Sequence, residues 1–194
     1  MIYGTKTELV DANIKKTDVV LDVGFVGQGV TENDANWVHA LLKRITTEVY
    51  GIDLEFDDKK YPAPHYQKAS AESFHFPEKF DVIFAGDLIE HLSNQGLFLA
   101  LCRQHLKVGG RLILTTPNCF NLFNLASKFT HYEPTTNKDH TCYYNVRTLK
   151  QLLGKNGFTM TRVDYLYSLE NQSARKLKEA ISQCAVFSCI KIHR

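Results

Sequence analysis

The chain has 194 residues, enough to bury one substantial core, so we expect a single domain over residues 1–194. Hydrophobic residues make up 44% of the chain and charged residues 23%, a balance that argues against a disordered or fibrous protein. The net charge of +2 gives no support to electrostatic capture of nucleic acid.

A strand, a helix and a second strand are predicted first. Asp18–Val23 is a short β-branched apolar run that ends at a glycine loop, as expected for a strand buried on both faces. Apolar residues recur at helical spacing from Glu32 to Ile45. Glu48–Ile52 is the next predicted strand, and Asp53 lies just past its end. These three segments form a βαβ unit.

The middle of the chain repeats this alternation. Phe80–Ala85 is predicted as a buried strand and Gln95–Leu106 as a helix. Gly109 and Gly110 are expected to stop that helix before a strand at Arg111–Thr115. The alternation indicates an α/β protein with a mostly parallel sheet and helices on both faces.

The last third is predicted to contain three helices and two strands around one polar loop. The helices are expected over residues 118–129, 146–155 and 170–181, the strands over 158–166 and 184–192, and the loop over 135–142. We interpret the polar loop as a candidate lid or acceptor site.

Glycines after the first strand are the strongest sign of ligand binding. The segment V-V-L-D-V-G-F-V-G-Q-G contains Gly24, Gly27 and Gly29, where backbone can approach a ligand that a Cβ atom would displace. The same glycines can also serve only to make a tight turn. In Y-G-I-D-L, the Asp53 carboxylate can accept hydrogen bonds from ribose hydroxyls, or it can be a solvated strand end.

Five motifs in order give the chain a family resemblance. L-D-V-G-F-V-G-Q-G, Y-G-I-D-L, A-S-A-E-S-F-H-F, F-D-V-I-F-A-G-D-L-I-E-H-L and L-K-V-G-G-R-L-I-L-T-T-P-N resemble those of class I S-adenosylmethionine-dependent methyltransferases of the small-molecule type. The resemblance covers roughly residues 17–168. It implies a Rossmann-like, doubly wound, seven-stranded sheet whose last strand is antiparallel.

The resemblance also implies which residues bind S-adenosylmethionine, with S-adenosylhomocysteine as product. Asp22 and the glycine loop of Gly24, Gly27 and Gly29 would face the methionine part of the cofactor. Asp53 would bind the ribose, and Ala71 with Glu72 would border the adenine. Asp87 and Leu88 would close the site. Two departures are present. The loop has one additional residue between its first two glycines, and Ser70 stands where the family often has an acidic residue.

Asp87, His91 and His140 are the catalytic candidates. A helix that begins after Gly86 would place three side chains on one face beside the methyl group, those of Asp87, Glu90 and His91. The carboxylates could instead only cap a helix, and the histidine could only pack. Such a cluster could bind a divalent metal, but it lacks a further spaced ligand, so we expect none. His140 resembles a histidine of many small-molecule and sugar methyltransferases, and it suits proton removal. Alternatively, His140 only holds its loop in place.

We therefore expect methyl transfer to a small molecule at oxygen, with sugar and cell-surface polysaccharide precursors among the acceptors. Protein and nucleic-acid acceptors are not favoured, because an N-P-P-Y type motif is absent. A nicotinamide-dependent dehydrogenase would need G-x-G-x-x-G, and the glycines here are ordered G-x-x-G-x-G. A non-catalytic cofactor-binding or scaffold protein is the second alternative.

Cysteine usage and hydropathy bear on the compartment. The five cysteines are scattered without a C-x-x-C pair, so we expect reduced thiols and no zinc or redox motif. No run approaches the ~18 apolar residues of a membrane span. These features favour a soluble cytoplasmic protein, and they do not predict an oligomeric state.

Overall fold

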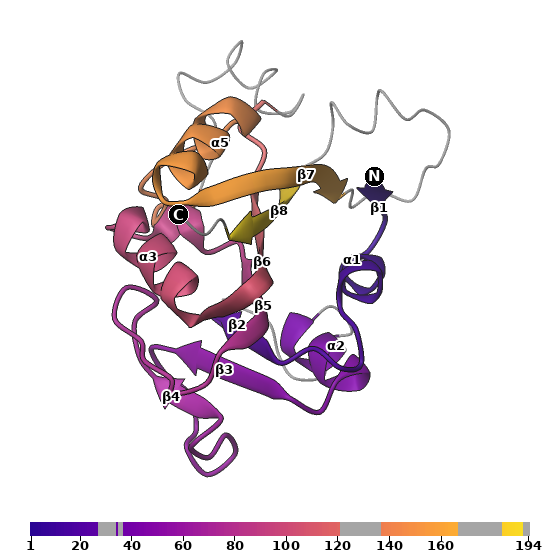
Figure 1. Ribbon diagram of the computed structural model, residues 1–194, viewed down its shortest axis with the longest axis vertical. Coiled ribbons are helices and arrows are strands. Elements are labelled where there is room, and N and C mark those ends of the chain that lie inside the picture. The colour runs from indigo at the N-terminus through magenta and orange to yellow at the C-terminus, as the bar shows by residue number, and fades with distance from the viewer. Residues whose placement is uncertain (27–33, 35–36, 121–136, 167–183, 192–194) are drawn as a thin grey trace.

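In the computed structural model, described here for residues 1–26, 34, 37–120, 137–166 and 184–191, one eight-stranded sheet carries helices on both sides (Figure 1). The strands are β1 (Ile2–Tyr3), β2 (Val20–Val23), β3 (Val49–Asp53), β4 (Tyr66–Lys68), β5 (Phe80–Gly86), β6 (Leu106–Pro117), β7 (Phe158–Leu166) and β8 (Cys184–Lys191). The helices are α1 (Lys6–Asn13), α2 (Val38–Ile45), the 3₁₀ helix η1 (Ile89–His91), α3 (Gln95–His105) and α5 (Val146–Lys155).

The strand order is β1-β7-β8-β6-β5-β2-β3-β4. Strands β4, β3, β2, β5 and β6 pair in parallel, and Val20 lies opposite Val49 on one side and Val82 on the other. β8 runs antiparallel to both β6 and β7, and β1 pairs in parallel with β7. The predicted α/β class with a mostly parallel sheet is confirmed. The described residues form eight strands instead of the expected seven.

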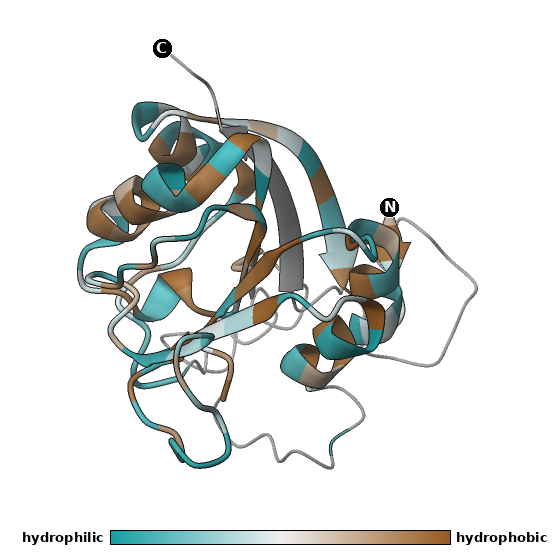
Figure 2. Cartoon of the chain, turned by 60° about the horizontal axis from the view of Figure 1, so that its bottom comes forward, coloured by the Kyte–Doolittle hydropathy of each residue, from teal (hydrophilic) through white to brown (hydrophobic). Residues whose placement is uncertain are grey.

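Alternate side chains of the central strands point into two apolar layers. Leu21 and Ile83 pack with α3 and α5, whereas Val20 and Val82 pack with α1 and α2. Figure 2 shows brown hydrophobic segments along the sheet and on the helices that flank it. Burial on both faces explains why these strands are predominantly apolar instead of alternating between apolar and polar residues. The prediction of helices on both faces is confirmed.

Local signals fix the helix starts. The Thr5 side chain accepts a hydrogen bond from the backbone N–H of Glu8 at the start of α1. Asn94 caps α3, with its Oδ1 accepting from the N–H of Leu97 at 3.0 Å. Asn145 opens α5 in a capping box with Thr148. Such caps satisfy N–H groups that the first helical turn leaves unpaired.

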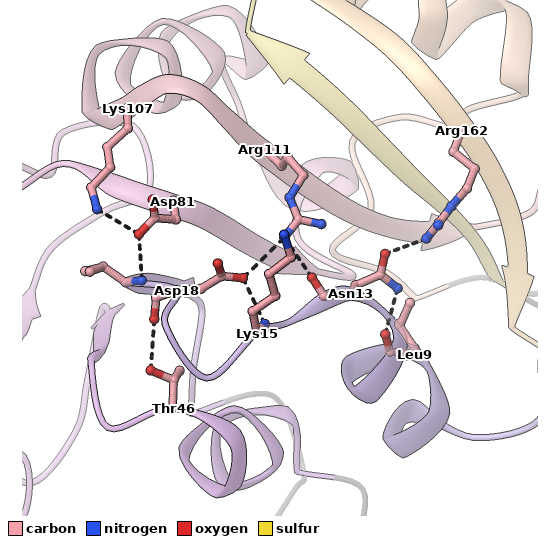
Figure 3. A network of polar contacts seen from close by, with 10 residues as sticks. Leu9, Asn13, Lys15, Asp18, Thr46, Asp81, Lys107, Arg111 and Arg162 are labelled. Carbon is pink, nitrogen blue, oxygen red and sulfur yellow. Dashed lines mark hydrogen bonds and ion pairs between the residues drawn. The ribbon is translucent and has the colours of Figure 1, made fainter.

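A polar network joins the end of α1 to the sheet (Figure 3). The Arg111 guanidinium donates to the Asn13 carbonyl at 2.9 Å and to Asp18 Oδ2 at 3.2 Å. Arg162 of β7 donates to the Asn13 side chain. Lys107 contacts Asp81 at 2.7 Å. The bonds of Arg111 and Arg162 hold α1 against strands that are distant from it in sequence, and the Lys107–Asp81 pair joins β6 to β5.

Some element boundaries differ from the predictions. β6 begins at Leu106, directly after α3, because Phe80 pairs with Leu106 and Val82 pairs with Arg111. The glycine pair therefore lies in an irregularity within β6 and not before it. Helix α2 begins at Val38, after the extended Trp37, and residues 32, 33, 35 and 36 of the predicted helix lie outside the described residues. The helix predicted over residues 170–181 and most of that over 118–129 fall outside the described residues.

The helices and the cysteines of the described residues have two further properties. No helix in the described ranges is long and apolar enough to cross a membrane. Cys102, Cys119 and Cys142 are free thiols, and burial raises the pKa of Cys102 well above its usual value.

Candidate functional site

A cavity of about 610 Å³ lies where the carboxyl ends of the parallel strands meet. Open α/β sheets bind ligands at this edge, and the volume is typical of small-molecule sites. The cavity is lined by Lys6, Val23, Gly24, Val26, Ile52, Asp53, Leu54, Ala69, Ser70, Ala71, Gly86, Asp87, Leu88, Glu90, His91, Leu92, Pro117, Asn137 and His140.

The turn after β2 brings backbone to the cavity wall. Gly24 has φ +79° and donates its N–H to the Ile52 carbonyl at 2.8 Å. A side chain is strained at this φ, so a glycine is favoured here. A Cβ at Gly24 would also lie 3.4 Å from Leu88 Cδ1. Gly27 and Gly29, the other predicted loop glycines, lie outside the described residues.

Asp53 ends β3 with its carboxylate at the cavity. Its Oδ2 accepts from the N–H of Val26 at 3.0 Å, and its Oδ1 accepts from the N–H of Leu54 at 2.8 Å. Each carboxylate oxygen has two lone pairs, so each retains acceptor capacity. The geometry leaves Asp53 able to accept from two neighbouring hydroxyls of a ribose.

Residues that follow β4 form another wall. Ala71 and Ser70 line the cavity as expected, and the Ser70 hydroxyl accepts from the N–H of Glu72 at 3.1 Å. Glu72 itself is not a lining residue. Its Oε1 accepts from the N–H of Asn94 at 2.6 Å, so this carboxylate holds the segment before α3.

Asp22 lies beneath the glycine turn and does not line the cavity. It is 3% exposed, and its Oδ2 lies 3.1 Å from Nδ1 of the fully buried His39. The other ring nitrogen of His39 lies 3.0 Å from the hydroxyl of Tyr66. Burial, followed by the nearby Asp22 carboxylate, raises the pKa of Tyr66. Sequence reasoning missed this network because His39 is one apolar-face position among several in α2.

Gly51 of β3 lies close to the aromatic rings of Phe25 and Tyr66. A Cβ built on Gly51 would lie 2.8 Å from Phe25 Cδ1 and 2.9 Å from Tyr66 Cδ1. Real Cβ atoms do not approach carbon atoms so closely, so the packing requires a glycine at Gly51.

Asp87 stands at the end of β5 in a left-handed conformation with φ 48°. Its N–H donates to the Thr115 hydroxyl, which donates in turn to Asp87 Oδ1, both at 2.9 Å. Lys6 Nζ lies 4.0 Å from Asp87 Oδ2. Non-glycine residues held in this region of φ often mark functional sites. Lys6 was not among the predicted site residues, since nothing in the sequence connects α1 to this edge.

Glu90, His91 and His140 come together in one cluster. One ligand atom from each lies within 4.8 Å of those of the other two. The imidazole centroids of His91 and His140 are 4.6 Å apart and nearly perpendicular. Glu90 is 1% exposed, and its Oε2 accepts from the Thr116 hydroxyl at 2.9 Å. Glu90 Oε1 and the Nδ1 atoms of both histidines are buried without a hydrogen-bond partner among the described residues.

Burial dominates the electrostatics of this cluster. It raises the pKa of Glu90 to about 7, and the negative charge of Asp87 adds to the rise. Burial, followed by the neighbouring His91, lowers the pKa of His140. In both cases the low-dielectric surroundings disfavour the charged form. Perturbed groups that line a cavity are candidates for chemistry.

Seven predicted site residues line the cavity, and the structure brings them together from five parts of the chain. They are Gly24, Asp53, Ala71, Asp87, Leu88, His91 and His140. Pro117 and Asn137 also line it and were not predicted individually, although Asn137 lies in the polar loop over residues 135–142 that was interpreted as a candidate lid or acceptor site.

A family model described as a methyltransferase domain matches residues 5–163. The human mitochondrial ubiquinone biosynthesis O-methyltransferase is 28% identical over 169 residues, which cover 77% of this chain and 44% of that protein. The enzyme of the same name from Rattus norvegicus is 32% identical over 113 residues, covering 51% of this chain and 30% of that protein. The chain thus spans less than half the length of these curated relatives.

Solved structures share the fold. A SAM-dependent methyltransferase from Archaeoglobus fulgidus superposes with a TM-score of 0.62 at 20% identity, covering 95% of this chain and 94% of that one. The 1,6-didemethyltoxoflavin-N1-methyltransferase of Burkholderia thailandensis, solved with S-adenosylhomocysteine, superposes with a TM-score of 0.62 at 16% identity, covering 97% of this chain and 77% of that one. At these identities the likeness establishes the Rossmann-like fold.

Proposed function

Because the chain belongs to the family of S-adenosylmethionine-dependent methyltransferases, we propose that it transfers a methyl group from S-adenosylmethionine to an oxygen atom of a small molecule. The observation that carries the proposal is the continuity of one cavity. It extends from the Asp53 carboxylate to the cluster of Glu90, His91 and His140. A cofactor and its acceptor can therefore meet in the same space.

The cofactor end of the cavity is at β3 and β4. Asp53 would accept from the ribose hydroxyls, and the wall of Ala69, Ser70 and Ala71 would border the adenine. Gly24 and Leu88 would flank the methionine part, because the glycine turn allows close backbone approach. Asp22 would act indirectly, by fixing the turn from below. Ser70 would offer the adenine amino group a neutral acceptor in place of a carboxylate.

The acceptor end is at η1 and the Asn137–His140 segment. In the transfer, an acceptor oxygen forms a bond to the methyl carbon while the bond from that carbon to the sulfonium sulfur breaks. The sulfur leaves as the neutral thioether S-adenosylhomocysteine, and the acceptor hydroxyl loses its proton. Much of the catalysis is alignment of the two reactants. Asp87, His91 and His140 are the side chains next to which that proton would be released.

Oxygen as the methylated atom is supported by the curated relatives, which are named as O-methyltransferases. Those names give no support to sugar or polysaccharide precursors as acceptors. The cavity volume of about 610 Å³ suits a small acceptor beside the cofactor.

Isothermal titration with S-adenosylmethionine, S-adenosylhomocysteine and NAD tests the cofactor. We expect both sulfur compounds to bind and NAD not to bind. If neither sulfur compound binds at millimolar concentration, the proposal fails. Transfer of a labelled methyl group to a panel of hydroxylated small molecules then tests catalysis. Cofactor binding without transfer to any member of a broad panel would favour the scaffold alternative.

Variants of the acceptor end test the catalytic residues. His140→Ala, His91→Ala and Asp87→Asn should each lower turnover about a hundredfold, the effect typical of a lost proton-transfer group. Their affinity for S-adenosylhomocysteine should change less than about threefold. His75→Ala, at an exposed histidine outside the cavity, is the matched control and should keep full turnover.

A further inference from the structure

Three ligand side chains, those of Glu90, His91 and His140, meet at the acceptor end of the cavity, with one ligand atom of each within 4.8 Å of those of the other two. Glu90 Oε1, His91 Nδ1 and His140 Nδ1 each lack a hydrogen-bond partner in the part of the chain that the structure describes. An unsatisfied buried polar atom costs about 1–3 kcal/mol. Three in one cluster are therefore expensive, and buried polar groups of this kind call for a partner.

The cluster is not held together by its own hydrogen bonds. Thr141, next to His140, anchors the loop by donating its N–H to the Glu90 carbonyl at 2.8 Å and its hydroxyl to the Leu92 carbonyl at 2.9 Å. The other Glu90 oxygen already accepts from Thr116 at 2.9 Å. Neighbouring residues thus position the cluster and leave its three free atoms available to a common partner.

A single metal cation can satisfy three such atoms together. Neutral imidazole nitrogens and a carboxylate oxygen donate lone pairs, and a metal ion accepts all three at once. In a tetrahedral site with bonds of about 2.1 Å, ligand atoms lie about 3.4 Å apart. The ligand atoms of the three residues are at most 4.8 Å apart, so binding a metal would draw them together by up to about 1.4 Å.

We propose that Glu90, His91 and His140 bind a divalent transition-metal cation of the Mn²⁺, Co²⁺ and Zn²⁺ class. Two imidazoles favour these borderline ions over Mg²⁺ or Ca²⁺, which prefer oxygen ligands. Two histidines and one carboxylate are also a ligand set that leaves coordination positions open. No metal was expected from the sequence, because Asp87, Glu90 and His91 lack a further spaced ligand nearby in the chain. His140 supplies that ligand from a distant loop.

The role of this cation in catalysis rests on the proposed function, whereas its binding does not. The cluster lines the same cavity as the cofactor residues, so an open coordination position would face the acceptor. A cation there would lower the pKa of the acceptor hydroxyl and allow its proton to leave to solvent. The acceptor oxygen would then be ready to attack the methyl carbon.

Metal binding by the full chain tests the proposal without any turnover assay. After dialysis against a chelator, the protein would be titrated with CoCl₂, MnCl₂, ZnCl₂ and MgCl₂ by calorimetry. The visible absorption of Co²⁺ and the electron paramagnetic resonance of Mn²⁺ would report the ligands. We expect one transition-metal ion per chain and at least tenfold weaker binding of Mg²⁺. Glu90→Gln and His140→Ala should each weaken Co²⁺ binding about a hundredfold.

Matched controls separate the site from adventitious binding. Glu48→Gln and His75→Ala change an exposed carboxylate and an exposed imidazole, and they should leave Co²⁺ affinity unchanged. Circular dichroism and S-adenosylhomocysteine binding confirm that each variant is folded. If His140→Ala does not fold, the nearly isosteric Glu90→Gln carries the test.

The outcomes distinguish this proposal from the proposed function. The metal site is overturned if no transition metal binds at millimolar concentration, or if Glu90→Gln leaves the Co²⁺ affinity and spectrum unchanged. Methyl transfer that persists at full rate with excess chelator would retain the proposed function and remove the catalytic role of the metal. Stoichiometric Co²⁺ binding by a protein that binds neither sulfur compound would retain the metal site and refute the proposed function.

Discussion

Asp53 offers a sharp test of where the cofactor ribose binds. Its two carboxylate oxygens each accept one backbone N–H, from Val26 at 3.0 Å and from Leu54 at 2.8 Å. One acceptor position per oxygen is left for a ribose hydroxyl. A hydrogen bond to a charged group contributes about 1.5–3 kcal/mol. Losing two of them in Asp53→Ala should cost about 3 kcal/mol, a loss of more than a hundredfold in affinity.

Asp53→Asn should have a smaller effect, because its amide retains one oxygen acceptor. We expect a loss of about 1.5 kcal/mol, or roughly tenfold in affinity. The assay is calorimetric titration with S-adenosylhomocysteine at fixed salt. Asp58→Ala is the control, because Asp58 is exposed and pairs with Lys68 at 2.9 Å on the surface. Its affinity should stay within about twofold of the parent.

The Asp53 variants also change the free protein, since Val26 loses its acceptor. Thermal unfolding without ligand measures this effect separately, and affinities are compared only for variants that are folded at the titration temperature. A folded Asp53→Ala protein with less than a threefold change in affinity would refute the assignment of the ribose to Asp53. The cofactor would then have to bind in another orientation.

Further predictions concern stability, measured by urea unfolding. His39→Leu should lower the free energy of unfolding by about 2–4 kcal/mol, because leucine leaves the buried partners of both ring nitrogens unsatisfied. A decrease of less than about 1 kcal/mol would contradict this prediction. Burial opposes ionisation of Asp81, but its hydrogen bonds, first from Lys107, bring its pKa below the usual value. The ionised Asp81 carboxylate therefore stabilises the fold above its pKa in the unfolded chain, about 4. This stabilisation is lost as the pH falls through the lower pKa of Asp81 in the folded protein. Asp81→Asn should flatten the loss of stability between about pH 5 and pH 2, and an unchanged slope would contradict it. Gly51→Ala should lower the free energy of unfolding by about 1–3 kcal/mol through overpacking. Gly154→Ala, at a position on α5 with open space around it, should raise the free energy of unfolding by about 0.5–1 kcal/mol. Equal effects of the two substitutions would refute the close packing at Gly51.

The sequence predicted the elements whose signals are local. β2, β3 and β5 are predominantly apolar, and each was placed within two residues of its observed bounds. β4 has three residues, Tyr66–Lys68, and it exists because it pairs with the end of β3. β1 has two residues and pairs with β7, which is more than 150 positions away. Such short strands carry no periodic signal, and their stability comes from the existing sheet edge.

The same distinction explains the site. Gly24, Asp53 and Asp87 directly follow or end parallel strands, and these positions meet at one edge in any such sheet. Asp22 was expected to face the cofactor, yet side chains alternate along a strand. Its neighbours on β2 point toward α3 and α5, so Asp22 points toward α2 and His39. A motif read as a string of letters does not contain this alternation.

The position of His140 depends on contacts that no local pattern carries. His140 lies fifty positions after Glu90 in the sequence. Its neighbour Thr141 connects the two segments by donating its N–H and its hydroxyl to the Glu90 carbonyl. The sequence analysis left open whether His140 merely holds its loop in place. Thr141 makes the hydrogen bonds that join this loop to Glu90, and His140 Nδ1 adds none among the described residues. The buried, unpartnered Nδ1 atom is a cost to the fold, which a bound ligand or cation would offset.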